Sequence, residues 1–233
     1  MAAAALSSCR VLVTGGLGVL GLAVGSLLAE RGASVILLDR AAWDGVPLPG
    51  VAGVLGGVDL ADEVAAQAAL VETDRQLGGL NALVNLAGGF RWETLEGGSL
   101  ASWDALYSMN LRSAVVACRA ALPHLRRAQP SAIVNVGALA AAKAAAGMGA
   151  YAASKAGVAR LTEALAEEMK DQGVRVNAVL PSILDTPANR ADMPDADATR
   201  WVQPRALAGV IAFLLTDDAG AITGACLPVA GRV

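Results

Sequence analysis

Short, continuous apolar runs alternate along the chain with stretches in which apolar residues recur at helical spacing. Residues 11–14 form one such run, which ends in glycines. Behind it, Leu20, Val24, Leu27 and Leu28 recur every three or four positions. A continuous run is typical of a strand buried on both faces, and the recurrence is typical of an amphipathic helix. The pattern therefore predicts a strand followed by a helix.

The same alternation continues to the end of the chain. It predicts further strands at residues 34–38, 53–58, 80–86, 132–136, 174–180 and 225–229. It predicts further helices at residues 61–77, 100–127 with a break near Asn110, 151–172 and 204–215. Alternation without a linker favours the α/β class, with residues 1–233 forming a single-domain, Rossmann-type, doubly wound parallel sheet of about seven strands with helices on both faces. Ligands bind such sheets at the carboxyl ends of the strands.

Residues 181–203 are rich in Pro, Asp, Asn and Arg and show no periodic pattern. Loops of this length in compact domains are usually lids or binding loops, and we expect one here. The acids in it, Asp192, Asp195 and Asp197, lack the glycine and the final glutamate of a calcium loop. We expect them to be solvated.

Composition restricts the kinds of partner. The chain has 233 residues, of which 55% are hydrophobic and 17% charged, and its formal net charge is −3. Such a chain can bury a sizeable core, which excludes disorder, and its charge argues against a nucleic-acid partner. Residues 11–29 are uncharged but contain five glycines, so we expect a strand and a helix there rather than a membrane anchor. A small-molecule substrate fits best.

The cysteines Cys9, Cys118 and Cys226 are far apart, with no C-x-x-C motif and no histidine nearby. This spacing argues against a disulfide framework and against a zinc site, and it fits a reducing compartment. We therefore expect a cytoplasmic protein that binds no metal. The single histidine, His124, is expected on the surface or packed between helices.

A glycine-rich segment lies between the first strand and the first helix. Gly16, Gly18 and Gly21 form a G-x-G-x-x-G pattern. Asp39 lies eighteen residues beyond Gly21, at the end of the second predicted strand. This spacing predicts a dinucleotide site, because the glycines allow a tight turn and leave helix N–H groups free for a pyrophosphate. An acid at position 39 can bind ribose hydroxyls and would repel a 2′-phosphate. It favours NAD(H), although Arg40 beside it leaves NADP(H) open.

Tyr151 and Lys155 lie one helical turn apart, so their side chains share a face of the predicted helix. An ammonium near a phenol lowers the pKa of the phenol and suits it to proton transfer. Taken alone, such a pair is more often a surface pair than a catalytic one. The neighbouring motifs change that reading.

Together these residues resemble the short-chain dehydrogenase/reductase family over essentially the whole chain. The motifs occur in family order: Thr14-Gly-Gly-Leu-Gly-Val-Leu-Gly21, Asp59-Leu60, Asn85-Leu-Ala-Gly88, Asn110 within Met-Asn-Leu, Ile133-Val-Asn-Val136, Tyr151-Ala-Ala-Ser-Lys155 and Asn177-Ala-Val-Leu-Pro181.

The resemblance implies roles for particular residues. Tyr151 is expected to exchange the proton, Lys155 to hold the nicotinamide ribose and lower the pKa of the tyrosine, and Asn110 to anchor a relay water. Asp59 is expected to contact the adenine. The full set expected at the cofactor comprises Gly15, Gly16, Leu17, Gly18, Val19, Leu20, Asp39, Arg40, Asp59, Leu60, Asn85, Ala87, Gly88, Tyr151, Lys155, Pro181 and Thr186.

The chain departs from the usual family pattern at two places. The usual glycine pattern is T-G-x-x-x-G-x-G, but Val19 stands at its sixth position and the glycine has moved to Gly18. The family's catalytic serine lies thirteen residues before the tyrosine, where this chain has Ala138. Loss of an oxyanion donor typically costs about 2.7 to 4 kcal/mol, so ordinary carbonyl reduction should suffer.

Both departures resemble the quinonoid dihydropteridine reductase branch of the family. The segment 180–197, followed by Trp201, is similar to that branch's L-P-x-x-L-D-T-P-x-N-R-x-x-M-P-x-A-D, and Ala87-Gly-Gly-Phe90 is similar to its A-G-G-W. A quinonoid dihydropterin is planar, electron-poor and accepts hydride readily. The resemblance therefore implies an NAD(P)H-dependent reductase of such substrates, with a pocket formed by Ala138, Phe90, Trp92 and Trp201.

Two other functions stay open: an ordinary carbonyl or alcohol oxidoreductase that works without the serine, and a non-catalytic NAD-binding scaffold or sensor. Retention of Tyr151, Lys155 and Asn110 argues against the sensor. Family members usually associate through the helices expected at 111–127 and 151–172, which implies a homodimer or homotetramer. Lys143 and Arg190 are expected to be solvated.

Overall fold

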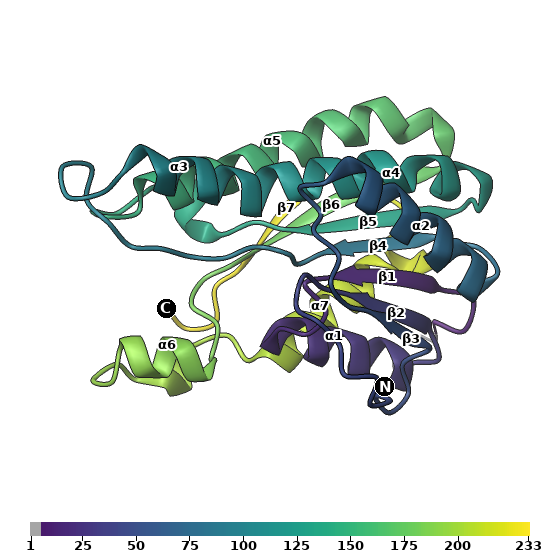
Figure 1. The fold of residues 1–233 in the computed structure, drawn as a ribbon, viewed down its shortest axis with the longest axis horizontal. Coiled ribbons are helices and arrows are strands. Elements are labelled where there is room, and N and C mark those ends of the chain that lie inside the picture. The colour runs from purple at the N-terminus through teal and green to yellow at the C-terminus, as the bar shows by residue number, and fades with distance from the viewer. Residues whose placement is uncertain (1–5) are drawn as a thin grey trace.

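The computed structural model describes residues 6–233 and contains one parallel sheet (Figure 1). The strands are ordered β3-β2-β1-β4-β5-β6-β7, and every pairing is parallel. The order reverses between β1 and β4, the position at which doubly wound sheets bind ligands. The strands are β1 (Arg10–Thr14), β2 (Ser34–Leu38), β3 (Gly53–Leu55), β4 (Ala82–Asn85), β5 (Ser131–Val136), β6 (Val174–Pro181) and β7 (Cys226–Val229).

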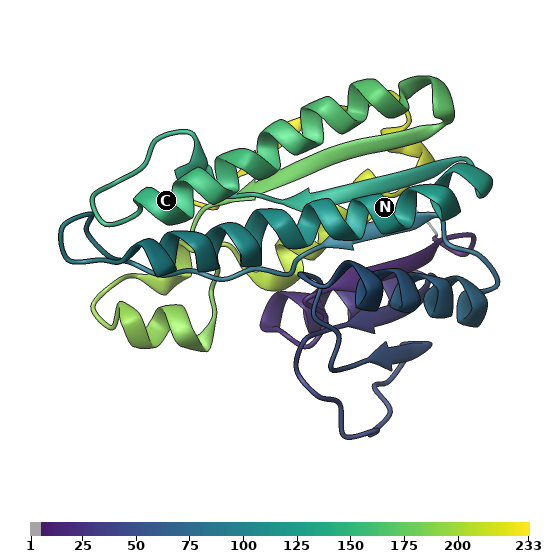
Figure 2. The same cartoon turned by 45° about the horizontal axis from the view of Figure 1, so that its top comes forward.

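Helices cover both faces of the sheet. One face carries α1 (Val19–Glu30) and α7 (Pro204–Leu214). The other carries α2 (Glu63–Leu77), α4 (Ser113–Arg127) and α5 (Gly149–Met169), which lie side by side in Figure 2. This arrangement confirms the expected single-domain doubly wound fold.

The two faces follow from the alternation of side chains along each strand. In β1, Val11 and Val13 belong to the core cluster on the α1–α7 side, whereas Leu12 belongs to the cluster on the α2–α4–α5 side. All three side chains are fully buried. A strand buried on both faces needs apolar residues at every position, which is why the strands read as continuous apolar runs.

The expected break near Asn110 is a change of helix type. Helix α3 (Leu100–Tyr107) passes through a π-helical turn at Ser108–Arg112 into α4. Such turns occur often at functional sites. The expected break is therefore wrong as an interruption of the helix: only the hydrogen-bonding pattern changes at Ser108–Arg112, and the chain continues as one rod (Figure 2).

The expectation of an irregular segment over residues 181–203 is wrong in part. Strand β6 extends to Pro181, and helix α6 forms at Pro187–Asp192. Thr186 caps α6 by accepting a hydrogen bond from the Asn189 N–H, and Pro187 occupies its first turn, where its missing N–H costs nothing. Residues 11–29 divide into β1 and α1, and no helix within residues 6–233 is long and apolar enough to cross a membrane.

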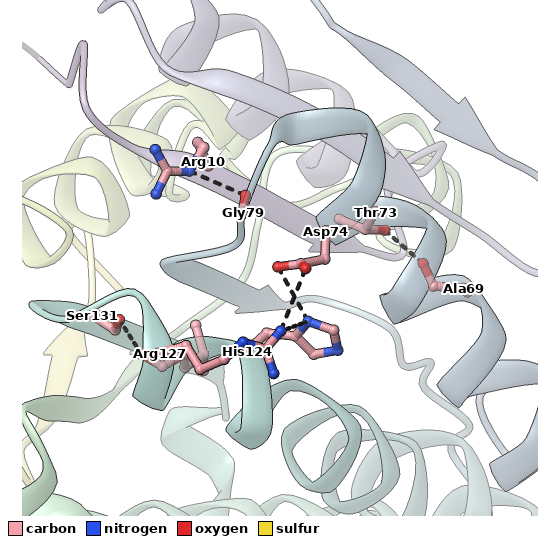
Figure 3. A network of polar contacts seen from close by, with 9 residues as sticks. Arg10, Ala69, Thr73, Asp74, Gly79, His124, Arg127 and Ser131 are labelled. Carbon is pink, nitrogen blue, oxygen red and sulfur yellow. Dashed lines mark hydrogen bonds and ion pairs between the residues drawn. The ribbon is translucent and has the colours of Figure 1, made fainter.

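A polar network joins α2 to α4 at the amino ends of the strands (Figure 3). Asp74 of α2 lies 3.1 Å from Nδ1 of His124 and 3.4 Å from the guanidinium of Arg127, both on α4. Nearby, Arg10 of β1 donates to the Gly79 carbonyl. His124 is buried, so it packs between helices as expected. The network lies at the end of the sheet opposite the ligand-binding end.

Candidate active site

A cleft of about 1780 Å³ lies at the carboxyl ends of the strands. It extends from the glycine-rich turn, past the ends of β2, β4, β5 and β6, to helix α6. Doubly wound sheets bind their ligands in this position. The sequence-predicted residues that line it are Gly15, Gly18, Val19, Leu20, Asp39, Arg40, Asp59, Leu60, Ala87, Gly88, Phe90, Trp92, Ala138, Tyr151, Lys155, Pro181 and Thr186.

The glycine-rich turn is packed so closely that it requires glycine. Gly15 has φ +63°, and a Cβ there would lie 2.8 Å from the Ala87 nitrogen. A Cβ at Gly21 would lie 2.2 Å from the Gly15 carbonyl oxygen. The N-cap residue of α1 is Gly18, which has no side chain to accept from the first N–H groups, and the first turn contains no acidic residue. The first N–H groups of α1 therefore face the cleft uncapped, as an anion site requires.

Asp39 is held in place at the end of β2. Its carboxylate accepts hydrogen bonds from the Leu17 N–H at 3.0 Å and the Ala41 N–H at 2.9 Å. These contacts fix the acid beside the glycine-rich turn. Arg40 and Asp59 line the same end of the cleft. A dinucleotide's ribose and adenine would meet this group of side chains, so the residues fit the cofactor.

Lys155 is buried beneath the cleft. It is 6% exposed, and its Nζ donates to the Val136 carbonyl at 2.9 Å. Burial lowers the pKa of Lys155 to about 8 because a charged ammonium loses its hydration there. The side chain thus extends from α5, which also carries Tyr151, to the end of β5.

Burial raises the pKa of Tyr151 to about 12. The expectation that Lys155 lowers this pKa is wrong for this structure, because the ammonium is directed at Val136 and loss of hydration dominates at the phenol. Tyr151 also meets Phe90 edge to face, with ring centroids 5.0 Å apart and planes at 85°. The phenol therefore stays protonated over the neutral pH range.

Asn110 connects the loop after β4 to α5. Its Oδ1 accepts from the Gly89 N–H at 2.8 Å, and its Nδ2 donates to the Gly89 carbonyl and to Ser154 Oγ. Ser154 Oγ in turn donates to the Tyr151 carbonyl. The π-helical turn thus places an amide where it holds both walls of the catalytic end. A Cβ at Gly88 would lie 2.6 Å from Asn110 Oδ1.

Five sequence-predicted residues do not line the cleft. Gly16 packs against Leu37, Leu17 contributes its N–H to Asp39, and Asn110 is 1% exposed. Asn85 points into the core, where its amide donates to Asn135 and Cys118. Trp201 is 6% exposed and packs in the interior. Asn85, Asn110 and Trp201 thus support the site from behind, because their side chains are buried.

Sequence reasoning missed several cleft residues. Met109, Met148 and Met193 line the cleft, as do Arg91 and Asp192. Met109 precedes Asn110, and Met148 lies one turn before Tyr151. Their closeness to these motifs in the sequence could have indicated that both methionines line the cleft. Met193 and Asp192 are brought in by α6, which the sequence pattern did not reveal.

Comparison with known proteins agrees with this geometry. A family profile described as short chain dehydrogenase matches residues 10–197. A 4-formylbenzenesulfonate dehydrogenase of Comamonas testosteroni is 32% identical, covering 94% of this chain and 95% of its own. A 3-oxoacyl-[acyl-carrier-protein] reductase of Vibrio cholerae is also 32% identical, with coverage of 94% and 95%. Among solved structures, a short chain dehydrogenase from Burkholderia cenocepacia in complex with NADP has a TM-score of 0.87 and 33% identity, covering 97% of this chain and 98% of its own.

The fold, the cleft and these relatives define an NAD(P)-dependent oxidoreductase. The chain belongs to the short-chain dehydrogenase/reductase family. A 3-ketoacyl-(acyl-carrier-protein) reductase from Brucella melitensis, 27% identical with a TM-score of 0.84, was solved with NADH, so both nicotinamide cofactors occur among similar structures. The comparisons establish the family and do not single out the dihydropteridine reductase branch.

Proposed function

We propose that this protein is an NADH-dependent reductase of small, planar, electron-poor substrates of the quinonoid dihydropterin type. The observation that carries the proposal is Ala138, which lines the catalytic end of the cleft beside Tyr151 and offers no hydroxyl to a substrate oxygen. A substrate that accepts hydride into a conjugated ring depends less on such a donor than a simple ketone does.

NADH is preferred in this proposal because of Asp39. Its carboxylate is fixed at the ribose end by two backbone N–H groups, and a 2′-phosphate there would meet like charge. Arg40 beside it is exposed, and its positive charge would partly offset the repulsion of a 2′-phosphate. We therefore expect tighter binding of NADH than of NADPH, without complete exclusion of NADPH. The N–H groups at the start of α1 would hold the pyrophosphate, Asp59 the adenine, and Lys155 the second ribose.

The chain's own residues would handle the proton. When bound, the nicotinamide supplies the hydride. Tyr151 stays protonated because burial raises its pKa to about 12, so it acts as proton donor in the reductive direction. The Phe90 ring rests on the tyrosine and, with Ala138, presents an apolar surface to a flat substrate. Asn110 holds the Gly89 backbone and, through Ser154, the tyrosine's helix in register.

A second candidate function is reduction of an ordinary aldehyde or ketone. The names of the Comamonas and Vibrio relatives support it, since they describe an aromatic aldehyde and a 3-oxoacyl group as substrates. In this case a water or backbone group would replace the missing serine. The pterin substrate rests on the residues of this chain alone.

The test is NADH oxidation by the purified protein with quinonoid dihydropterin, compared with ketones, aldehydes and quinones. We expect the pterin to be turned over far faster than the ketones. Tyr151→Phe should lower turnover by about 10²- to 10⁴-fold and leave NADH affinity, followed by nicotinamide fluorescence, nearly intact. Tight NADH binding without turnover of any substrate would favour a sensor, and collapse of NADH affinity in the variant would reassign Tyr151 to cofactor binding.

We further propose a cytoplasmic homodimer or homotetramer. Of the apolar residues on the two long helices, Ala114, Ala121, Val158 and Leu165 are buried within this chain, whereas Val115 is 39% exposed. The core thus uses most of these faces, and the remaining exposed positions are available to a partner. Light scattering of the purified protein measures the assembly, and a monomer would contradict it.

A further inference from the structure

Two loops form one rim of the catalytic end. Residues 90–98 follow β4, and residues 142–148 precede α5. The Glu93 N–H donates to the Gly147 carbonyl at 2.9 Å, and the Trp92 indole N–H donates to the Ala146 carbonyl at 3.0 Å. A Cβ at Gly147 would lie 2.1 Å from the Trp92 ring. The loops are thus fastened to each other, and we refer to residues 90–98 and 142–148 as the clasped rim.

The clasped rim carries two exposed cations that line the cleft, Arg91 and Lys143. Within residues 6–233, no carboxylate forms an ion pair with either of them. Arg91 donates to the neutral hydroxyl of Ser102, and that hydroxyl donates to Glu93. The nearby acid is therefore already occupied. Other exposed cations within residues 6–233, such as Arg40 and Arg112, also lack an ion-pair partner. What distinguishes Arg91 and Lys143 is their position on the rim that carries Trp92.

Apolar side chains line the cleft together with these cations, namely Phe90, Trp92 and Met148. Of the acids, Glu93 of the clasped rim already accepts from Ser102 and from the Ser99 N–H. Asp192, which also lines the cleft, belongs to α6, which lies below the layer of α3, α4 and α5 in Figure 1. A ligand seated on the aromatic surface would present its far end to Arg91 and Lys143. A charge-assisted hydrogen bond to such a cation is stronger than one between neutral groups, and at these exposed positions it is screened by salt.

We infer that the clasped rim binds an anionic substituent, a carboxylate or a sulfonate, on the planar substrate, with Lys143 and Arg91 as specificity-determining residues. The inference rests on the proposed function for the position of the reacting ring over Tyr151. It adds a requirement that neither the cofactor site nor Tyr151 imposes: the substrate should carry negative charge at the end remote from the reacting atom.

Binding can test this without turnover. Calorimetry of the NADH-bound protein compares naphthalene-2-sulfonate with its neutral isostere naphthalene-2-sulfonamide. We expect the sulfonate to bind about tenfold more tightly, and this ratio to fall as ionic strength rises. In Lys143→Gln with Arg91→Gln the ratio should approach one. Lys143→Arg should preserve it, because the charge is kept.

The control for the single substitution Lys143→Gln is Lys170→Gln, which also removes one positive charge, from an exposed site at the far end of α5. It should leave the ratio unchanged. Equal binding of the two ligands, or a sulfonate preference that survives the double substitution, would overturn the inference. NADH oxidation with 1,2-naphthoquinone and its 4-sulfonate separates the two proposals: turnover of the neutral quinone without a sulfonate preference leaves the reductase standing and removes the anion site.

Discussion

At the residue scale, the catalytic end is dominated by the cost of burying charge. Lys155 is enclosed beside Val136, and its pKa falls to about 8, whereas the pKa of Tyr151 rises to about 12. Both shifts favour the neutral form of the group, because burial removes hydration from the charged form. At neutral pH only the lysine shift lowers stability, because the phenol is protonated in both the folded and the unfolded chain. The fold therefore bears the cost of a buried lysine at a position that lines the cleft.

This cost predicts that Lys155→Met stabilises the fold. Lys155 has a pKa of about 8 when folded and an ordinary value of 10.5, so between these values the unfolded chain binds more protons and stability rises with pH. Below pH 8 the penalty is fully present. The variant should gain up to about 3 kcal/mol at pH 7, offset in part by the lost hydrogen bond, and the gain should shrink towards pH 10. Urea denaturation at both values measures it, and a gain independent of pH would contradict it.

A second prediction at this scale concerns Ala138. Ala138→Ser restores a hydroxyl at the catalytic end of the cleft, so kcat/KM for simple ketones should rise by about 100-fold. Ala140→Ser adds the same hydroxyl two residues away on the same wall and serves as the control. Steady-state NADH oxidation gives both values. Equal effects of the two substitutions would show that the pocket's shape, rather than a missing donor, limits ketone reduction.

At the scale of elements, the clasped rim depends on one backbone conformation. Gly147 has φ +76° and touches the Trp92 ring, so it has neither the space nor the dihedral for a side chain. The two loops approach each other at this residue and share the Glu93 to Gly147 hydrogen bond. The rim is consequently a single unit, although its halves are some fifty residues apart in sequence.

We predict that Gly147→Ala opens the rim. Gly45→Ala is the control, because Gly45 has a similar φ of +84° but nothing within 4 Å of its virtual Cβ. Both substitutions impose backbone strain of about 1–2 kcal/mol. Gly147→Ala should destabilise further and raise KM severalfold by displacing Trp92. Thermal unfolding and steady-state kinetics measure the stability and the KM of the two variants. Equal stability and equal KM would mean that the Trp92 contact has no role in the rim.

In the molecule as a whole, the cleft and the polar network between α2 and α4 lie at opposite ends of the sheet. The cleft occupies the carboxyl ends of the strands, and the network of Asp74, His124 and Arg127 occupies the amino ends (Figure 3). The first end holds the ligand groups, and the second ties α2 to α4. We therefore expect substitutions in the polar network to lower stability without changing activity, and substitutions in the cleft to change activity.

We expect Asp74→Ala to lower the free energy of unfolding by about 1–2 kcal/mol, since it leaves a buried histidine and an arginine without their acceptor. The kcat/KM of the folded enzyme should stay within twofold. Glu167→Ala, which breaks an exposed pair with Lys170, should have little effect on either quantity. Chemical denaturation and NADH oxidation measure both, and a large loss of kcat/KM in Asp74→Ala would show coupling between the two ends.

The order of residues along the chain was enough to predict the strands, most of the helices and the glycine-rich turn. Strands buried on both faces must be apolar throughout, and the turn at Gly15 and Gly21 tolerates no Cβ, so both leave a local signature. Tyr151 and Lys155 were singled out because their one-turn spacing occurs together with the other motifs of the family. The contact of Gly21 with Gly15 and the spacing of Tyr151 and Lys155 involve neighbours within a few residues, which the sequence shows directly, whereas Gly15 is also confined by Ala87 of a distant segment.

Contacts between segments far apart in the chain could be seen only in the folded structure. The contact of Trp92 with Gly147, the pairing of His124 with Asp74 and the burial of Trp201 each involve segments that no local pattern relates. The direction of the Tyr151 pKa shift likewise depends on the folded structure. An i, i+4 spacing places Lys155 near the phenol, but the direction of its ammonium and the loss of hydration depend on how the sheet and the loops enclose them.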